Sequence, residues 1–546
     1  MANTVRTRVL VLAHPKASVE DRQAGKGARL LALPPPGLVP SLWDMVEERT
    51  HKSLWTVSTP ARRYPALQGD LEVDVVVIGG GIAGLTTAYL LKQEGKRVAV
   101  VEMHRLLTGQ TGQTTAHLTE LLDTPYATLA SDFGEKGARL AAESTRAAIE
   151  QIAGLVDRLR ISCGFQRLPG YRYAETEQEA RELEREASAA RQAGLMCALT
   201  EEVPLPYPVK LALRVEDQAQ FHPREYLLAL AEGIQGGGSY VFEETQVTEL
   251  YEGVPCRVHT PRGIITCRDV VEATTTPLNR VFLHTKLYAY RTYAVAARLE
   301  GPLEAGLYYD SRDPYHYIRT QRVEGVDYVI VGGEDHKVGS EEDTDRRYAE
   351  LEAYTRRRFP VTQIDYRWSG QVIEPADGLA YIGRNSNSRH VWVATGFSGN
   401  GMTFGTLSGM LLTDLIMGRQ NPYAALYDAT RVKPKAGAKD FIQENAEVAF
   451  RFVADRLAKP EAKELSEVPP GEGRIMEVDG KKVAVFREES GAVHAVSPVC
   501  THVGCYVHWN KGERSWDCPC HGSRFSPTGE VLNGPAVKPL PSKKIR

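Results

Sequence analysis

The chain has 546 residues, of which 42% are hydrophobic and 25% charged, and its formal net charge is −3. The length exceeds what one compact core usually holds, so the ordinary composition predicts a globular protein of about two to four domains. The near-neutral charge gives no reason to expect nucleic acid or an anionic membrane as a partner. No apolar run approaches the roughly 18–20 residues that span a bilayer, and we recognise no secretory signal, so we expect a cytoplasmic protein.

The first clear pattern follows residues 1–70, which we expect to form an N-terminal extension and lead-in. Residues 73–78 are an apolar, β-branched run that predicts a buried parallel strand. A helix is predicted at 85–94 and a second strand at 98–101. Together these elements make one βαβ unit.

A glycine-rich turn joins the first strand to the helix. Gly79 allows a tight turn, Gly81 lets a pyrophosphate approach the backbone, and Gly84 permits close packing of helix and strand. Ile82 and Ala83 stand in the same turn. Glu102 ends the second strand, where a carboxylate can bind a ribose hydroxyl pair. The turn therefore predicts a dinucleotide site, and this motif alone leaves NAD and FAD open.

The rest of the chain reads more coarsely. Residues 136–200 are rich in Ala, Glu and Arg at helical spacing, and strand patterns then alternate with short helices to about residue 380. Further predicted elements are a strand at 391–394, a helix at 407–417, an amphipathic helix at 437–458, and short β segments at 474–478, 483–486 and 492–496.

Half of the eight cysteines crowd into residues 500–520. The segments Cys500-Thr501-His502 and Cys518-Pro519-Cys520-His521 each offer one thiolate and one imidazole. Two thiolates suit one ferric iron and two imidazoles the other, which predicts a [2Fe-2S] cluster. A zinc site and a redox dithiol are the alternatives, although zinc sites usually have a longer spacing between histidines.

The cysteine pattern resembles the Rieske proteins of cytochrome bc complexes. The resemblance implies that Cys500, His502, Cys518 and His521 bind the cluster and that a disulfide joins Cys505 to Cys520. Ser523 matches a family serine that donates to a bridging sulfide. Phe525 stands where the family has a tyrosine donor, so we expect a lower reduction potential than in respiratory Rieske proteins.

Two further segments resemble the D-amino-acid oxidase superfamily of FAD enzymes, which includes glycine, sarcosine and gamma-glutamylputrescine oxidases. They are residues 109–116 and residues 377–403, and the lead-in at 53–71 resembles the putrescine oxidase branch. The resemblance selects FAD and covers about residues 55–430. It implies a helix N-terminus that faces the flavin and further contacts along the cofactor. The FAD-binding residues implied beyond the first turn are Thr111, Gly112, Thr114, Thr115, Val247, Thr274, Gly399, Asn400, Gly401 and Met402.

The substrate site is the least defined part of the sequence. The resemblance implies a mixed sheet over the flavin, and its candidate catalytic residues here are Tyr317, Arg319 and His316. Alternation along a strand places Tyr315, Tyr317 and Arg319 on one face and His316 on the other. Packing within the sheet is the alternative role. Further candidates in this region are His117, His336, Tyr288, Tyr290 and Tyr293.

The expected fold is an α/β (α+β) FAD-binding Rossmann-like domain with an interleaved mixed-sheet substrate domain, followed by a small all-β Rieske domain. We expect the oxidoreductase at 71–435, a linker helix at 436–465 and the Rieske domain at 466–546. Within the oxidoreductase, the FAD-binding segments are about 71–130, 215–285 and 370–430, and the substrate domain is about 131–214 and 286–369.

The expected function is oxidation of an amine or amino acid at a C–N bond, with electrons passing from FAD to the cluster. One alternative is a reductase or electron-transfer component that feeds a partner oxygenase or other acceptor, and a second is a non-enzymatic redox module. A one-electron acceptor or donor protein is a possible partner. An oxygenase is disfavoured because no triad of two histidines and one carboxylate follows the Cys/His segment.

Replacing Gly81 by valine is expected to remove FAD while the iron signal remains. The valine side chain would fill the space that the pyrophosphate needs, whereas the cluster belongs to a separate domain. Flavin absorbance and the EPR signal of the reduced cluster measure the two cofactors independently. Stoichiometric flavin in the variant would show that the glycine turn is misassigned.

Overall fold

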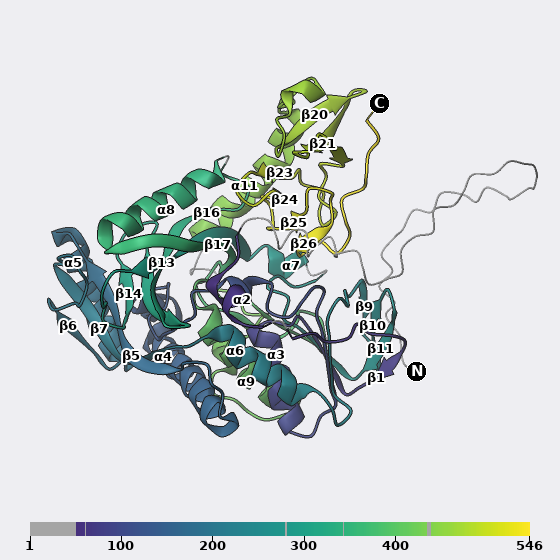
Figure 1. Ribbon diagram of the computed structural model, residues 1–546. Helices are drawn as coiled ribbons and strands as arrows, with labels where there is room; N and C mark the ends of the chain where they lie inside the picture. The colour runs from purple at the N-terminus through teal and green to yellow at the C-terminus, as the bar shows by residue number, and fades with distance from the viewer. Residues whose placement is uncertain (1–50, 61, 279–280, 342, 434–437, 546) are drawn as a thin grey trace, which may run out of the picture. The chain divides into compact units, whose positions relative to one another are not determined.

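The computed structural model describes residues 51–60, 62–278, 281–341, 343–433 and 438–545. The predicted N-terminal extension lies outside the described residues up to residue 50. In the described part, three sheets with their helices precede two small C-terminal sheets (Figure 1). No helix in that part combines the length and the apolar character needed to cross a membrane.

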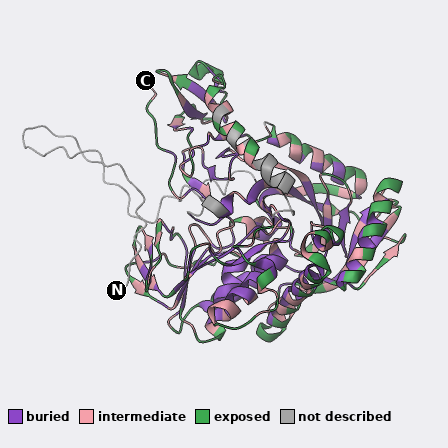
Figure 2. Ribbon diagram, turned by 180° about the vertical axis from the view of Figure 1, so that it is seen from behind, coloured by how far each residue is buried: buried purple, intermediate pink, exposed green. Residues whose placement is uncertain are grey.

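A six-stranded sheet contains the predicted βαβ unit. Its order is β18-β19-β12-β2-β3-β8, and it is parallel except for the edge strand β18. Alternate residues of its central strands pack into two different apolar clusters, so every residue of β2, β3 and β12 is buried (Figure 2). The strands are β2 (Val75–Ile78), β3 (Val98–Val101), β8 (Tyr240–Phe242), β12 (Asp269–Glu272), β18 (Tyr381–Arg384) and β19 (Val391–Thr395).

Helix α3 packs against both α9 and α6 beside this sheet (Figure 1). Both α3 and α9 begin earlier than predicted, because glycines of the preceding turns lie inside their first turns. The three helices are α3 (Ile82–Gln93), α6 (Pro223–Ile234) and α9 (Gly401–Ile416). The other helices before the C-terminal part are α2 (Leu54–Ser58), α4 (Tyr126–Leu159, interrupted at Gly134), α5 (Glu177–Ala193), α7 (Val281–His284), α8 (Thr344–Arg358) and α10 (Ala424–Tyr427).

A nine-stranded mixed sheet runs in the order β17-β13-β16-β15-β14-β5-β7-β4, with β6 paired to β7. Two of its strands, β5 and β6, interrupt the region 136–200 that the composition predicted to be helical throughout. That prediction was wrong there, because β5 carries two tyrosines that fill a sheet core. The strands are β4 (His117–Leu118), β5 (Gln166–Ala174), β6 (Cys197–Thr200), β7 (Leu211–Gln220), β13 (Leu287–Leu299), β14 (Leu307–Asp310), β15 (Tyr317–Val323), β16 (Val326–Lys337) and β17 (Val361–Pro375).

A separate four-stranded sheet has the order β1-β11-β10-β9, and three of its strands directly precede β12 in the sequence. Its strands are β1 (Leu71–Glu72), β9 (Glu249–Tyr251), β10 (Cys256–Thr260) and β11 (Gly263–Cys267).

The C-terminal module, which we define as strands β20 to β26, follows helix α11 (Ala438–Leu457) and a short 3-10 turn, η2 (Leu465–Glu467). Its strands form two antiparallel sheets around a core that contains Trp516 and Phe525. The predicted all-β C-terminal domain is confirmed. The strands are β20 (Gly473–Val478), β21 (Lys481–Arg487), β22 (Val493–Val496), β23 (His508–Asn510), β24 (Ser515–Asp517), β25 (Arg524–Phe525) and β26 (Val531–Asn533).

One half-buried carboxylate joins this module to the large mixed sheet. Glu513, between β23 and β24, accepts a hydrogen bond from Arg291 Nη2 at 2.9 Å. It also accepts from Tyr348 Oη at 2.9 Å and from Ser369 Oγ at 2.6 Å. Burial alone would raise the pKa of Glu513, but Arg291, with His51 and Arg524, holds it well below its usual range. The module is therefore fixed by an ion pair that water does not reach freely.

Glu513→Gln is expected to destabilise the protein by about 3–5 kcal/mol, because it leaves the buried charge of Arg291 without its counter-ion. The folded-state pKa of Glu513 is depressed. Its contribution is therefore complete above the unfolded carboxyl pKa of about 4.3 and is lost as the pH falls through the folded pKa. Thermal unfolding of wild type and variant at several pH values measures both effects.

Glu489→Gln is the matched control, since this carboxylate is exposed and lies 3.4 Å from Arg514. Its effect is expected to stay within about 0.5 kcal/mol. Equal melting temperatures for wild type and Glu513→Gln would contradict the role of the ion pair.

Candidate functional site

The glycine turn after β2 has the close approaches that a dinucleotide site needs. A Cβ at Gly79 would lie 2.4 Å from the Ala273 carbonyl oxygen, and one at Gly84 would lie 1.9 Å from the Gly79 oxygen. Gly81 differs, since its Cβ would meet only the Thr111 side chain, at 2.9 Å. The outer glycines are therefore required by packing, and Gly81 leaves the backbone open where a phosphate would approach.

Glu102 is held at the end of β3 by two backbone amides. Gly80 N donates to Oε2 at 2.8 Å, and His104 N donates to Oε1 at 2.9 Å. Because the carboxylate is fixed against the glycine turn, it stands where the ribose of a nucleotide bound there would lie.

The hydroxyl-rich segment forms a 3-10 turn, η1 (Gln110–Gln113), against the N-terminus of α3. Ile82 N donates to Thr111 Oγ1 at 3.1 Å, and a Cβ at Gly112 would lie 1.9 Å from the Leu107 oxygen. Thr114 Oγ1 accepts from Ala116 N, and Thr115 Oγ1 contacts His117 Nδ1 at 2.9 Å. The turn is thus brought to the dinucleotide site, as the resemblance implies.

Two other predicted FAD residues lie in loops beside the six-stranded sheet. Thr274 follows β12 and donates to the Thr276 oxygen at 2.8 Å. Val247 is buried in the cluster that lies under β2 and β3. Neither contact identifies a ligand, so their roles at FAD remain a prediction.

The N-terminus of α9 carries the predicted flavin-facing residues Gly399, Asn400, Gly401 and Met402, with Asn400 as the N-cap. Asp123 closes this turn: Oδ2 accepts from Gly399 N at 2.5 Å, and its own N–H donates to Asn400 Oδ1 at 3.1 Å. Burial raises the pKa of Asp123. Sequence reasoning missed Asp123, which stands in no motif and is recognised only from its contact with α9.

A polar chain connects Asp123 with the large sheet. Tyr315 Oη donates to Asp123 Oδ1 at 3.2 Å, and Tyr317 Oη lies 2.6 Å from Thr292 Oγ1. Thr292 in turn hydrogen-bonds Asp335, whose pKa burial raises to about 7. Asp335 Oδ1 is buried without a hydrogen-bond partner among the described residues. Thr292 and Asp335 were also missed, because their strands meet Tyr317 only across the sheet.

Two of the three predicted catalytic residues are occupied by protein partners. His316 Nδ1 lies 2.8 Å from Asp310 Oδ2, and its ring stacks on Tyr354 at 3.8 Å. Burial opposes its protonation, but Asp310 and Glu334 raise the pKa of His316 above its usual value. This histidine lies on the sheet face opposite Tyr317, as the alternation predicts, which speaks against direct catalysis.

Arg319 is fully buried and donates from Nη1 to three backbone oxygens, of Thr115, Ala116 and Phe221, at 2.9 to 3.2 Å. The guanidinium therefore holds the loop beside the predicted flavin site and is not aimed at a substrate. Of the predicted catalytic set, Tyr317 alone faces the polar chain to Asp335.

The histidine candidates are also placed. His117 lies between Tyr309 and Tyr317, and burial lowers its pKa to about 3, so its ring is neutral. His336 instead contacts Tyr293 Oη at 2.9 Å and stacks on that ring. Tyr293 in turn packs on Tyr348, which donates to Glu513, so this histidine belongs to the region that fixes the module.

The Cys/His segments of the module meet on one side of its core. Cys505 and Cys520 form a disulfide, with an S–S distance of 2.07 Å, as the Rieske resemblance implies. Cys500 and Cys518 are free and buried. Contact with Cys518 lowers the pKa of Cys500, and the backbone N–H of His502 acts in the same direction.

His502 and His521 complete the donor set, with ring centroids 5.0 Å apart. Burial lowers the pKa of His502 to about 3 and that of His521 to about 4, so both rings are neutral, the form that binds metal. Nδ1 of His521 is buried without a hydrogen-bond partner among the described residues. Two adjacent thiols and two neutral imidazoles fit a [2Fe-2S] cluster with mixed ligands.

The buried sulfurs of Cys505, Cys518 and Cys520 also lie within 4.8 Å of one another in the described part of the chain. Because two of these sulfurs are joined in the disulfide, this group does not supply three thiolates. Ser523 is fully buried and its Oγ accepts from Ala536 N at 3.0 Å, which leaves the hydroxyl proton free to donate toward the cluster position. Phe525 lies in the core below.

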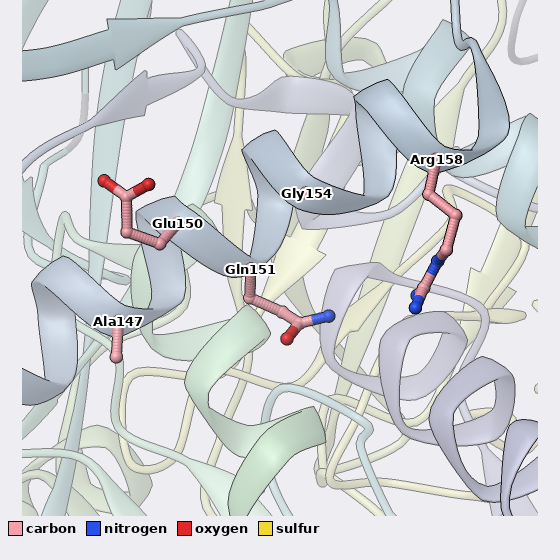
Figure 3. A pocket seen from close by; sticks show the side chains of 5 residues that line it. All are labelled: Ala147, Glu150, Gln151, Gly154 and Arg158. Carbon is pink, nitrogen blue, oxygen red and sulfur yellow. The ribbon is translucent and has the colours of Figure 1, made fainter.

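An open hollow of about 460 Å³ lies elsewhere, along helix α4 (Figure 3). Its lining comes from a single stripe of that helix and includes none of the predicted site residues. The lining residues are Ala147, Glu150, Gln151, Gly154 and Arg158.

Comparison with known proteins agrees with both halves of the site. Residues 74–415 match the family of FAD-dependent oxidoreductases of the D-amino-acid oxidase type, and residues 459–544 match the Rieske [2Fe-2S] domain. The Bacillus subtilis protein YhfW, whose name describes a Rieske 2Fe-2S iron-sulfur protein, is 36% identical over 90% of this chain and 97% of its own.

Two other relatives resemble only the larger part. The gamma-glutamylputrescine oxidoreductase of Escherichia coli is 24% identical over 65% of this chain and 86% of its own. The structure of glycine oxidase from Geobacillus kaustophilus superposes with a TM-score of 0.58 at 21% identity, over 66% of this chain and 99% of that one. The latter likeness shows the fold alone.

The expected cofactors, FAD and a [2Fe-2S] cluster, are those of the two matched families. The chain belongs to the FAD-dependent oxidoreductases of the D-amino-acid oxidase type and carries a C-terminal Rieske [2Fe-2S] domain.

Proposed function

We propose that the chain oxidises an amine or amino acid at its C–N bond and that the electrons pass within the chain from FAD to the Rieske cluster. The relative named gamma-glutamylputrescine oxidoreductase supports this substrate class. Bound FAD would accept a hydride from the substrate carbon, whereas a Rieske cluster accepts single electrons.

The observation that carries the electron route is the position of Gln371 on β17. Its backbone N–H donates to the Gln110 side chain, which opens the turn that bears Thr111 and Gly112. Its side-chain Nε2 donates to the Gly522 oxygen at 3.0 Å, and Gly522 directly follows the proposed ligand His521. One buried residue therefore contacts both proposed cofactor segments.

Gly522 allows this approach because it has no side chain. Its φ is +74°, and a Cβ would lie 2.3 Å from Gln371 Nε2 and 2.5 Å from Ala289 Cβ. The cluster loop can therefore lie directly against β13 and β17. Electron transfer between cofactors bound at these two segments would need no movement of the module.

The polar chain beside α9 favours a cationic amine as substrate. Asp123 and Asp335 are both half-buried, and loss of solvent around each carboxyl raises its pKa. Gly399 N–H and Arg172 partly compensate Asp123, whereas Asp335 Oδ1 has no hydrogen-bond partner among the described residues. An ammonium group would compensate the charge of Asp335. Arg319, the cation that could bind a substrate carboxylate, is instead satisfied by backbone oxygens.

Asp335 is also suited to accept the substrate's ammonium proton. A general base works best when its pKa lies near the working pH, and burial places that of Asp335 at about 7. Thr292, hydrogen-bonded to Tyr317 Oη, fixes its orientation.

Asp335→Asn is expected to slow anaerobic bleaching of the flavin by the best substrate of an amine and amino-acid panel by about 100- to 10,000-fold. Because only the ionised carboxylate accepts a proton, the wild-type rate should rise as the pH increases through about 7. The variant should lose this rise.

Asp327→Asn is the matched control. It lies on the same strand, exposed and paired with Arg322, and should bleach as the wild type does. A wild-type rate and pH profile in Asp335→Asn would show that another group accepts the proton.

The electron route is tested with a full-length Cys518→Ser variant, which lacks one proposed cluster ligand. The variant should retain FAD and be bleached by substrate at the wild-type rate, yet reduce a one-electron acceptor such as cytochrome c poorly. In rapid mixing of wild-type protein with substrate, the EPR signal of the cluster should follow flavin bleaching.

Cys197→Ser is the control, because this cysteine is free and lies on β6. Unchanged turnover of Cys518→Ser with both oxygen and cytochrome c would show that the cluster does not carry the electrons.

A further inference from the structure

Three histidine rings lie close together where the C-terminal module contacts the rest of the chain. His284, on helix α7 between β12 and β13, lies 4.8 Å from His502 and 5.8 Å from His521, measured between ring centroids. Its ring is nearly perpendicular to that of His502, at 71°. His284 is 2% exposed, so it covers the two proposed ligand rings as part of the protein interior.

The proton position on His284 follows from its hydrogen bond. Nε2 lies 2.7 Å from the Pro277 carbonyl oxygen, which can only accept, so Nε2 carries the proton. Nδ1 is buried and has no hydrogen-bond partner among the described residues. With Nε2 as the donor, a neutral His284 presents a lone pair at Nδ1 toward its surroundings.

A histidine that binds metal has an N–H group that could donate to the lone pair on His284 Nδ1. An imidazole that binds iron through one nitrogen carries its proton on the other, and metal-bound histidines almost always donate that N–H to a fixed acceptor. Among the described residues, no side-chain or backbone oxygen accepts a hydrogen bond from His502, whereas the ring of His284 lies beside it.

We propose that His284 is a positioning residue of the cluster: once His502 is bound to iron, its N–H donates a hydrogen bond to His284 Nδ1, which has no hydrogen-bond partner in the structure as described, and this bond lowers the cluster's reduction potential. An acceptor on this N–H makes the imidazole a stronger electron donor, which favours the oxidised cluster. The inference rests on the ligand assignment and, for its use in electron flow, on the proposed function.

His284 also lies close in the sequence to a proposed FAD contact. The residue that fixes it, Pro277, lies three positions after Thr274, the proposed FAD contact at the end of β12. The residues from Thr274 to Pro277 and the hydrogen bond from His284 to Pro277 thus connect the proposed pyrophosphate region with the ring beside His502. His502 and His521 are themselves half-buried, and His284 lies against one side of this pair of rings.

The test compares His284→Phe, which keeps a planar ring and removes the acceptor, with His284→Gln, which restores an acceptor oxygen. Full-length holoprotein is titrated with dithionite and the cluster is followed by EPR. His284→Phe should have a higher potential, by an amount on the order of a tenfold change in the one-electron equilibrium, or about 59 mV. His284→Gln should return toward the wild-type value.

His259→Phe is the matched control, a histidine of the same part whose ring packs on Tyr251. It should leave the potential unchanged. An unchanged potential in His284→Phe with iron retained, or equal shifts in the Phe and Gln variants, would overturn the proposal.

If the His284→Phe variant does not retain iron, a measurement on the wild-type protein tests the proposal instead. The N–H proton of a buried, hydrogen-bonded His502 should remain in the proton ENDOR spectrum after brief transfer to D2O, whereas immediate loss would overturn the proposal. Dithionite bypasses both substrate and flavin, so these results stand apart from the amine and cytochrome c experiments that test the proposed function.

Discussion

The ion pair of a single half-buried carboxylate, Glu513, is the most demanding contact between the C-terminal module and the large mixed sheet. A charge placed among Arg291, Tyr348 and Ser369 can be accommodated only when all these donors are in position, so the contact is demanding in geometry. It fixes the hairpin between β23 and β24, and with it the two loops that carry the cysteines and histidines. The contacts of Gln371 with Gly522 and of His284 with His502 both depend on that placement.

The parts of the fold that were predictable from the sequence are those defined by local pattern. The β2–α3–β3 unit follows from one apolar run, three glycines and an acid that lie within about thirty residues of each other. The Cys/His segments are equally local, and the disulfide between Cys505 and Cys520 agrees with their resemblance to Rieske proteins. Both families are confirmed by the comparisons.

The parts that were not predictable depend on contacts between distant segments. Asp123 becomes notable only because α9 folds back onto it, and Asp335 because β16 pairs with β15 and β13. His316 and Arg319 show the opposite case. Their residue types suggested chemistry, but Asp310 and three backbone oxygens already satisfy them. A sequence shows which groups are present, and only the fold shows which of them are already satisfied.

The strand order of the six-stranded sheet has a consequence for biosynthesis. Its central strands β2 and β3 are made early, but β19 and the N-terminus of α9 are translated only after more than half of the chain has followed them. The nascent chain therefore carries the glycine turn and Glu102 before it contains α9, the helix predicted to face the flavin. Such long-range strand pairing is slow, and the apolar strands β2 and β3 stay partly unpaired until β19 has been made. From the strand order alone, we expect flavin insertion to be a late event that follows synthesis of β19 and α9.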